Sequence, residues 1–335
     1  MQNILKQLIE HRSLRQEQAK EIILGIGEGV YADPEILGLM VALQTRTLTL
    51  PEIKGFREAL LELSIKPDLD GTNAIDLCGT GGDGKNTFNI STTTAFVLAS
   101  MGYKVIKHGN YGVSSLCGSS NVLEALGIQF TADGNLLKEQ LNATNLCFLH
   151  APLFHPVMKK VAPLRKGLGI PTFFNIMGPL VNPIQPDYQL TGTFNLNIAR
   201  LYHHVLHSKR ENYHVIYSLD GYDEISLTGD TRVFGKYEDY IFNAQQLNLT
   251  HLNEVDLFGG TNTQEAGDML TNILKGKGTH AQHLVVASNT AHAIHLFDPK
   301  LEVKELFRTV LQHIESGKSF QHFKQFTYLQ EKQLA

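Results

Sequence analysis

The chain has 335 residues, of which 42% are hydrophobic and 19% charged, and its formal net charge is −4 at pH 7. This length is enough to bury a substantial core and predicts two structural units. The acidic balance offers no basic face to nucleic acid as a bulk partner. No apolar run approaches the ~20 residues that a membrane span requires, so we expect no membrane partner either.

The cysteines and the N-terminus indicate a cytoplasmic protein. Three cysteines, Cys78, Cys117 and Cys147, are odd in number and widely spaced, which argues against a disulfide framework or a zinc knuckle. We expect buried thiols in a reducing cytoplasm. The first residues, Met1 to Gln7, lack the apolar core of a signal peptide.

Residues 1–65 are predicted to form a small all-helical N-terminal domain. Ser13 is an expected N-cap with Gln16 as its capping-box partner, and Asp33 is an expected N-cap before Pro34. Pro51 begins a further helix whose apolar residues recur with a 3.6-residue period. Residues 66–72, which contain proline, glycine and three acidic or basic side chains, are predicted to be a hinge or linker.

Residues 73–335 are predicted to form a larger α/β domain. Short apolar runs alternate there with helical stretches, and the expected strands are Ala74–Leu77, Val105–Lys107, Leu146–Leu149, His214–Ser218 and Leu284–Ala287. Such alternation predicts a mostly parallel central sheet wrapped by helices. Two histidine pairs, His203 with His207 and His292 with His295, are interpreted as surface residues, because neither pair has a third metal ligand nearby in the sequence.

A glycine-rich loop follows the first of these strands. Four glycines lie between Gly79 and Gly84, and a hydroxyl-rich segment then begins a helix near Ser91. Glycines allow backbone N–H groups to surround an anionic oxygen, and a helix N-terminus adds positive potential. The loop therefore predicts a ligand that carries phosphate.

The same loop contains a G-x-G-x-x-G pattern, made by Gly79, Gly81 and Gly84, that is typical of dinucleotide sites. A dinucleotide site also needs an acidic residue about 20 positions later, to bind the ribose hydroxyls. The second expected strand continues instead into Lys107 and His108. Asp83 would repel a bare pyrophosphate unless a cation or a sugar hydroxyl lay between them. We therefore disfavour nicotinamide or flavin binding.

Three further segments contain side chains that are suited to binding a substrate or a metal ion. The second strand is followed by Lys107 to Ser115 and Ser119, which supply a cation, glycines, an amide and hydroxyls suited to phosphates and a sugar. The segment from Asp220 to Ser226 contains the adjacent carboxylates Asp223 and Glu224, which suit Mg²⁺ together with substrate phosphates. Arg165 offers a planar fork for a carboxylate, near a rigid segment from Phe174 to Pro183.

Taken together, these motifs resemble the anthranilate phosphoribosyltransferases. The resemblance rests on Gly79 to Asp83, Asn89 to Thr92, Lys107 to Asn110 with Ser114 and Ser115, Asn175 to Pro183, and Ser288 to Ala291. It covers nearly the whole chain, and the motifs occur in the family's order. It implies a homodimeric enzyme of tryptophan biosynthesis that joins anthranilate to phosphoribosyl diphosphate, with Mg²⁺ as cofactor and a helical domain hinged to an α/β domain.

The resemblance also implies roles for individual residues. Positions matching phosphoribosyl diphosphate contacts are Gly79, Gly82, Asp83, Thr87, Asn89, Ile90, Ser91, Thr92, Lys107, His108, Gly109, Asn110, Ser114, Ser115 and Ser119. Positions matching the anthranilate site are Gly79, Asn110, His155, Arg165 and Pro179. Magnesium positions are Ser91, Asp223 and Glu224. The helical domain is expected to form the dimer and part of the acceptor site.

The implied reaction needs no general base, because an aromatic amine is already neutral at pH 7. Catalysis is expected from charge stabilisation on the departing diphosphate by magnesium, Lys107 and backbone amides. The sequence departs from the family pattern at Tyr111 and Pro171, where arginines are usual, and at Asn121, where aspartate is usual. These departures affect diphosphate affinity and fine geometry more than the type of reaction.

Three alternatives remain open from the sequence. A pyrimidine nucleoside phosphorylase shares the architecture but lacks the Gly79 to Asp83 pattern. A nucleic-acid-binding relative of the fold would not be catalytic, and the acidic balance argues against it. A phosphoribosyltransferase for another aromatic acceptor is the nearest alternative.

Overall fold

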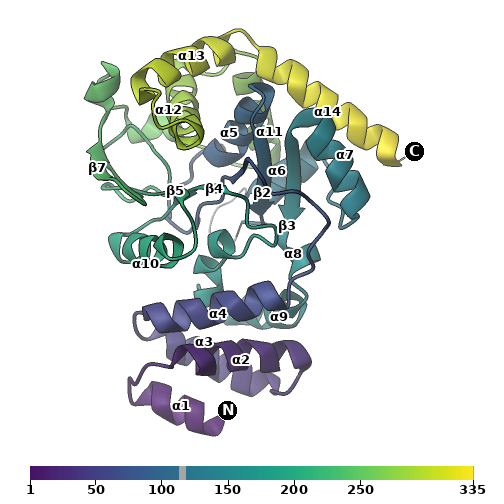
Figure 1. The fold of residues 1–335 in the computed structure, drawn as a ribbon, viewed down its shortest axis with the longest axis vertical. Coiled ribbons are helices and arrows are strands. Elements are labelled where there is room, and N and C mark those ends of the chain that lie inside the picture. Colours follow the sequence, from purple (N-terminus) through teal and green to yellow (C-terminus); the bar gives the residue numbers. More distant parts are fainter. Residues whose placement is uncertain (113–117, 335) are drawn as a thin grey trace.

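The computed structural model describes residues 1–112 and 118–334, and it consists of a stack of helices beside a larger α/β body (Figure 1). Ser114, Ser115 and Cys117 lie outside the described residues. Among the described helices, none combines the length and the apolar character that crossing a membrane would require.

The N-terminal stack is all-helical, as the sequence predicts. Its helices are α1 (Gln2–Ile9), α2 (Gln16–Glu28), α3 (Asp33–Gln44) and α4 (Leu50–Glu62). Two predicted N-caps are wrong. Arg15 caps α2 and donates its backbone N–H to the Gln18 side chain over 3.0 Å, while Ala32 caps α3 and donates to Glu35 over 3.0 Å. In both helices the polar side chain at the third helical position accepts a hydrogen bond from the backbone N–H of the N-cap residue. The N-cap residue itself therefore needs no polar side chain.

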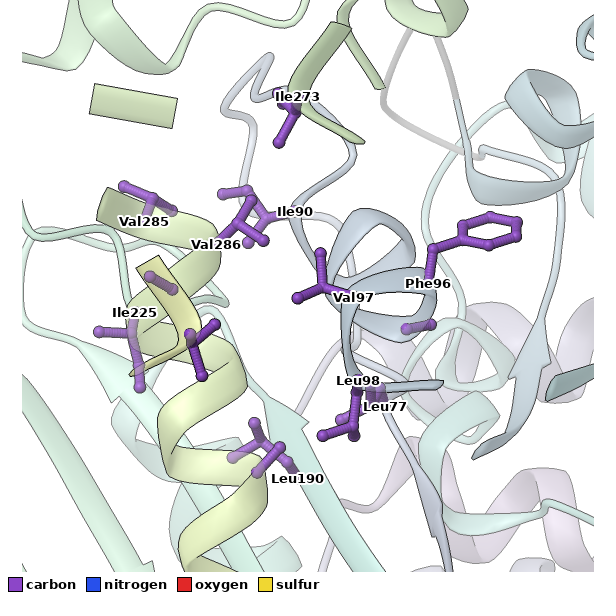
Figure 2. Packing of buried hydrophobic residues seen from close by; sticks show 14 of the residues in the cluster. Leu77, Ile90, Phe96, Val97, Leu98, Leu190, Ile225, Ile273, Val285 and Val286 are labelled. Carbon is purple, nitrogen blue, oxygen red and sulfur yellow. The ribbon is translucent and has the colours of Figure 1, made fainter. Parts of the chain in front are cut away.

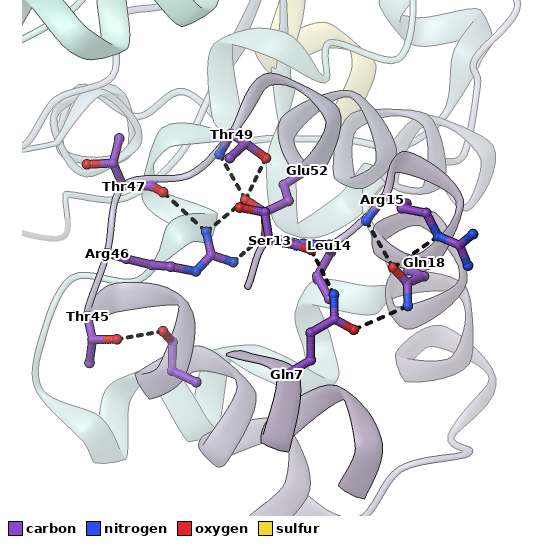
Figure 3. A network of polar contacts seen from close by, with 11 residues as sticks. Gln7, Ser13, Leu14, Arg15, Gln18, Thr45, Arg46, Thr47, Thr49 and Glu52 are labelled. Carbon is purple, nitrogen blue, oxygen red and sulfur yellow. Dashed lines mark hydrogen bonds and ion pairs between the residues drawn. The ribbon is translucent and has the colours of Figure 1, made fainter. Parts of the chain in front are cut away.

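A buried carboxylate organises the stack. Glu52 on α4 is fully buried, and its oxygens accept hydrogen bonds from the Leu14 N–H at 2.9 Å and the Thr49 N–H at 2.8 Å. Arg46 forms an ion pair with the same carboxylate (Figure 3). Burial raises the pKa of Glu52, but these hydrogen bonds outweigh it and the net pKa is lowered. Glu52 therefore ties the α1–α2 connection and the α3–α4 connection to α4.

The described strands form a seven-stranded sheet in the order β3-β2-β1-β4-β5-β6-β7. Its strands are β1 (Ala74–Asp76), β2 (Lys104–Gly109), β3 (Leu146–His150), β4 (Tyr188–Gly192), β5 (Asn212–Ser218), β6 (Thr231–Gly235) and β7 (Asp239–Phe242). The first five pair in parallel, and β6 and β7 extend the edge antiparallel. The mostly parallel sheet predicted from the sequence is confirmed.

Helices cover both faces of the sheet. The α-helices are α5 (Ile90–Ser100), α6 (Ser119–Ala125), α7 (Gly134–Thr144), α8 (Ala151–Phe154), α9 (Val157–Leu168), α10 (Leu196–His207), α11 (Thr263–Leu274), α12 (His280–Phe297), α13 (Val303–Glu315) and α14 (Lys318–Leu334). Short 3-10 helices are η1 (Phe173–Ile176), η2 (Gly178–Leu180), η3 (Ala244–Leu247) and η4 (Glu254–Leu257).

Alternate residues of the strands enter different cores. In β2, Val105 joins the large core beneath α5 and α12, while Ile106 packs on the other face with Leu137 and Leu141 of α7. The large core includes Leu77, Phe96 and Leu190 (Figure 2). Side chains of a strand point alternately to its two faces, so a strand buried on both faces reads as a continuous apolar run. This explains why β1, β2, β3 and β5 could be found from the sequence, whereas β4, which contains polar residues and glycine, was not predicted.

Two sequence expectations were wrong in the C-terminal third. Leu284–Ala287 is a segment of helix α12 rather than a strand, and its side chains pack in the large core (Figure 2). A short buried helix segment and a buried strand give the same apolar run. His292 lies on the same helix and is fully buried instead of lying at the surface, because most of this helix is buried. Its Nδ1 forms a hydrogen bond with the Ser288 carbonyl at 2.8 Å.

The helical stack and the α/β body share a core. Helices α9 and α10 pack on the stack, and Tyr213 and Val215 of β5 belong to the same apolar cluster as α2 and α4. Arg57 of α4 donates to the Leu180 carbonyl at 3.0 Å and to the Gln185 side chain at 2.7 Å. These contacts fix α4 against the segment that precedes β4.

We predict that Glu52→Gln lowers the free energy of unfolding by on the order of 3 kcal/mol, because it leaves the Arg46 charge without its buried partner. Since the folded pKa of Glu52 is lowered from the ordinary value of 4.5, its contribution is present above pH 4.5 and is lost as the pH falls. Urea denaturation at pH 7 and at lower pH measures both effects. Glu10→Gln, which alters an exposed ion pair, is the control; equal midpoints for wild type and Glu52→Gln would contradict the prediction.

Candidate active site

The carboxyl ends of four neighbouring parallel strands, β2, β1, β4 and β5, meet at one edge of the sheet. The loops that follow β1, β2 and β5 line a cleft with a volume of about 240 Å³. Such an edge is where open parallel sheets bind ligands. All the predicted site residues in the described part of the chain line this cleft: Gly79, Gly82, Asp83, Thr87, Asn89, Ile90, Ser91, Thr92, Lys107, His108, Gly109, Asn110, Ser119, His155, Arg165, Pro179, Asp223 and Glu224.

The glycine loop after β1 is held by the acidic loop after β5. The Gly81 N–H donates to the Asp223 carboxylate at 2.7 Å, and the Thr80 N–H donates to the Gly192 carbonyl at 3.0 Å. A side chain on Gly79 would bring its Cβ 2.8 Å from the Asp223 carboxylate, and one on Gly192 would overlap the Asp223 backbone carbonyl. Glycine at both positions allows the two loops to pack against each other.

The second half of the glycine loop is hydrogen-bonded to the end of η4 and to the segment that follows it. The Phe88 N–H donates to the Leu257 carbonyl at 3.0 Å, and the Asn86 side chain donates to the Gly260 carbonyl at 2.8 Å. Helix α5 then begins at Ile90, one residue before the sequence-based expectation. The residues at its N-terminus, Asn89, Ser91 and Thr92, line the cleft, and a helix N-terminus is a favourable place for an anion.

Three carboxyl groups crowd the floor of the cleft. Burial, followed by the charge of Asp223, raises the pKa of Asp83 to about 7. The same two causes raise the pKa of Glu224 to about 8, and burial raises the pKa of Asp223. Raised pKa values mean that full ionisation of this cluster is costly without an added cation.

This donor set fits magnesium. The carboxylates of Asp223 and Glu224 and the Ser91 hydroxyl are hard oxygen donors, and Glu224 is hydrogen-bonded to Ser91. Across residues 1–112 and 118–334, no group of three or more His, Cys, Asp and Glu side chains is arranged to hold a metal ion alone. Mg²⁺ commonly binds one or two carboxylates together with substrate phosphates and water, so this small set is sufficient when a phosphorylated ligand is present.

Lys107 lies beneath the carboxyl groups. Its side chain is buried, and its ammonium donates to the Leu77 carbonyl and to the Ser91 hydroxyl, the latter at 3.2 Å. Nearby, the buried Asp76 carboxylate accepts from the His108 N–H at 3.1 Å and from Asn182 at 3.0 Å. Lys107 therefore balances the acidic cluster from inside the protein while it lines the cleft.

Two neutral histidines form part of the wall opposite. Burial, and then His155, lower the pKa of His108 to about 3, and burial lowers the pKa of His155 to about 4. The two rings lie 5.2 Å apart, edge to face, and His108 Nδ1 bonds the Gly178 carbonyl at 3.0 Å. Groups with such low pKa values are uncharged at pH 7 and are weak proton acceptors.

Arg165 on α9 stands on the same side of the cleft. Its guanidinium donates to the Asn175 side chain at 3.1 Å and lies 5.8 Å from the centre of the Phe174 ring. Around it the cleft is apolar, and the lining residues there are Leu60, Met158, Phe174, Met177 and Val181. An arginine beside an apolar wall suits a flat aromatic molecule that carries a carboxylate.

The loop after β2 is tied to α6. The Asn110 carbonyl accepts from the Ser119 hydroxyl at 3.2 Å, and Asn121 accepts from the Gly112 N–H at 3.0 Å. Tyr111 lines the cleft mouth, and its hydroxyl donates to Glu124 at 2.8 Å. Tyr111 therefore contributes a phenol anchored by a carboxylate where the family pattern has a cation.

Sequence reasoning missed several residues that shape the cleft. Gly192 ends a strand that was not predicted, and Leu60 and Met158 read as ordinary core residues of helices. Lys85 also lines the cleft but resembles any solvated lysine in the sequence. The only available signal was their position beside predicted motifs, as for Lys85 directly after Gly84.

Comparisons with known proteins agree with this geometry. Residues 71–320 match the glycosyl transferase family, a/b domain, and residues 2–64 match the glycosyl transferase family, helical bundle domain. The anthranilate phosphoribosyltransferase of Christiangramia forsetii is 47% identical over 99% of this chain and 100% of that protein. The crystal structure of the Thermus thermophilus anthranilate phosphoribosyltransferase is 29% identical, with a TM-score of 0.87 over 98% of this chain and 99% of that one.

A Saccharomyces cerevisiae anthranilate phosphoribosyltransferase in complex with PRPP (phosphoribosyl diphosphate) and Mg shares the fold. The TM-score is 0.88, the identity is 24%, and the match covers 98% of this chain and 97% of that one. The chain therefore belongs to the glycosyl transferase family that combines a helical bundle domain with an a/b domain. Within that family it belongs with the anthranilate phosphoribosyltransferases.

We predict that Gly192→Ala abolishes turnover, because the added methyl group must displace the Asp223 backbone and with it the Gly81 contact. Gly167→Ala is the matched control: Gly167 lies within helix α9, and an added Cβ there meets nothing within 4 Å. The control should retain activity and gain up to about 1 kcal/mol of stability. Steady-state kinetics on both variants decide the matter, and normal turnover by Gly192→Ala would contradict the proposed packing.

Proposed function

We propose that this cleft transfers the phosphoribosyl group of phosphoribosyl diphosphate to the amine of anthranilate, giving N-(5-phosphoribosyl)anthranilate and diphosphate. The observation that carries the proposal is the 2.7 Å contact between the Gly81 N–H and Asp223, which places a phosphate loop beside an acidic pair. The membership in the anthranilate phosphoribosyltransferases supports the reaction, and the residues that line the cleft support it as the location.

Phosphoribosyl diphosphate would lie along the glycine loop and the start of α5. Its phosphates would accept hydrogen bonds from backbone N–H groups of the loop and from the hydroxyls of Ser91 and Thr92, and the Asn110 side chain faces the same space. The carboxyl of Asp83 is available to a sugar hydroxyl. Ser114 and Ser115, also expected as contacts, lie outside the described residues.

Magnesium would be held by Asp223, Glu224 and Ser91 together with the diphosphate. When bound, it supplies positive charge against the diphosphate as that group leaves. The raised pKa values of Asp83 and Glu224 support this assignment, because a cation removes the mutual repulsion of the carboxylates.

Anthranilate would occupy the apolar wall opposite, with its carboxylate at Arg165. The guanidinium is oriented by Asn175 and stacks near Phe174, so its position is fixed before a ligand arrives. Pro179 and His155 shape the same wall. In this arrangement the amine points toward the sugar held on the glycine loop.

The reaction would proceed by attack of the neutral amine on the anomeric carbon, as the bond from that carbon to the diphosphate oxygen breaks. The proton lost from the amine nitrogen would pass to the departing diphosphate or to water. We assign no general base, because His108 and His155 have pKa values of about 3 and about 4 and accept protons poorly at pH 7. Lys107 contributes a fixed positive charge beneath the site, and loop N–H groups contribute oriented dipoles. Binding of both substrates between two walls excludes water from the activated sugar.

The larger organisation is proposed on the same basis. We propose that residues 1–65 form a domain joined by the linker at 66–72 to the α/β domain of residues 73–335. We also propose that a hinge motion closes the cleft over its substrates, in which α9 and α10 move together with the stack on which they pack. We also propose a homodimer formed through the helical stack, where Ile9, Val30 and Val41 are exposed apolar side chains. The free thiols of Cys78 and Cys147 support a cytoplasmic location.

We predict that the protein consumes anthranilate when mixed with phosphoribosyl diphosphate and Mg²⁺, which a fall in anthranilate fluorescence measures. Arg165 should make the reaction selective, so 4-aminobenzoate, whose carboxylate lies para to the amine, should react at least about tenfold more slowly, as expected for a lost charge-assisted contact. Omission of Mg²⁺ is the control. Absence of turnover would contradict the proposal, and equal rates with both acceptors would favour a transferase for another aromatic amine.

A further inference from the structure

The geometry points to Lys85 as a further substrate-binding residue, which exchanges its contact with Glu254 for the diphosphate group of phosphoribosyl diphosphate. This inference rests on the proposed function and adds a residue to the same site. Lys85 directly follows the last glycine of the phosphate loop and lines the cleft.

The position of Lys85 between two loops gives its ammonium access to the diphosphate site. Its backbone N–H donates to the Asp83 carboxylate at 3.0 Å, which fixes the start of the side chain. Its ammonium lies 4.5 Å from the centre of the Tyr222 ring, and Tyr222 is the residue before Asp223. The charge therefore stands over the junction of the glycine loop and the acidic loop, where the diphosphate is expected.

The other cationic side chains of the cleft are not free to turn toward the diphosphate. Among the described residues, the lysines and arginines on the cleft wall are Lys85, Lys107 and Arg165. Lys107 is buried and already bonded to Leu77 and Ser91, and Arg165 stands on the acceptor wall with Asn175. Lys85 is thus the cation on the phosphate side whose ammonium reaches solvent and can turn toward a ligand.

The present partner of Lys85 is easily replaced. Its ammonium lies 3.0 Å from the Glu254 carboxylate on η4, and the Glu254 side chain is 67% exposed. Ion pairs at exposed positions contribute little to stability, because water screens both charges. A diphosphate carries more negative charge than one carboxylate and offers several acceptor oxygens, so it competes effectively for the same ammonium.

Calorimetric titration of full-length variants tests this directly, with magnesium diphosphate, phosphoribosyl diphosphate with Mg²⁺, and ribose 5-phosphate as probes. Lys85→Gln should weaken binding of both diphosphate-containing ligands about tenfold and leave ribose 5-phosphate binding unchanged. Lys85→Arg should restore most of the affinity. Glu254→Gln, which releases the lysine, should tighten diphosphate binding. Lys138→Gln, at a surface lysine paired with Asp68, is the matched control and should bind as wild type.

Kinetics give a second readout. In Lys85→Gln the KM for phosphoribosyl diphosphate should rise while the KM for anthranilate stays constant. Unchanged diphosphate affinity, or an equal loss for ribose 5-phosphate and diphosphate, would overturn the role of Lys85. Failure of the wild-type protein to bind phosphoribosyl diphosphate at all would instead overturn the proposed function, and the inference with it.

Discussion

The hydrogen bond from the Gly81 N–H to the Asp223 carboxylate joins two loops that leave the sheet from β1 and β5, strands that are separated by β4. It forms only because Gly192, at the end of β4, leaves room for the Asp223 backbone. The contact gives the phosphate loop its shape and presents the acidic pair to the same space. The acidic loop also brings Glu224 to the Ser91 hydroxyl, which is in turn hydrogen-bonded to Lys107 of β2.

The electrostatics of the cleft follow from that junction. Packing the loops together buries Asp83, Asp223 and Glu224, which raises the pKa of each, and the charge of Asp223 further raises the pKa values of Asp83 and Glu224. The buried Lys107 acts in the opposite direction on Asp223 and Glu224. The site is therefore built for an added cation and for a ligand that brings phosphate oxygens to it. The opposite wall, which is largely apolar and carries Arg165 as its charged group, is suited to an aromatic carboxylate. One wall therefore suits the phosphoribosyl donor and the other suits the acceptor.

Much of this arrangement could be predicted from the sequence, for physical reasons that also explain the failures. The glycine loop and the acidic pair are local patterns, and strands such as Leu146–His150, buried at every position, contain continuous apolar runs. Leu284–Ala287 gave the same signal although it lies in a buried helix, and β4 was missed because Thr191 and Gly192 interrupt its apolar character. Gly192, Leu60 and Lys85 lie beside residues that are distant in the sequence, so their place at the cleft is visible only in the fold. The ligand roles of the individual cleft residues remain predictions.

Asp223→Asn separates the hydrogen bond from the charge, because an asparagine oxygen can still accept from the Gly81 N–H while the carboxylate charge is lost. The decisive measurement is the affinity of this variant and of the wild type for phosphoribosyl diphosphate at increasing Mg²⁺ concentration. Our account predicts that wild-type affinity rises with Mg²⁺, and that the variant loses most of this response while its melting temperature is maintained. The same Mg²⁺ response in both proteins would contradict the role of Asp223 in holding the cation against the phosphate loop.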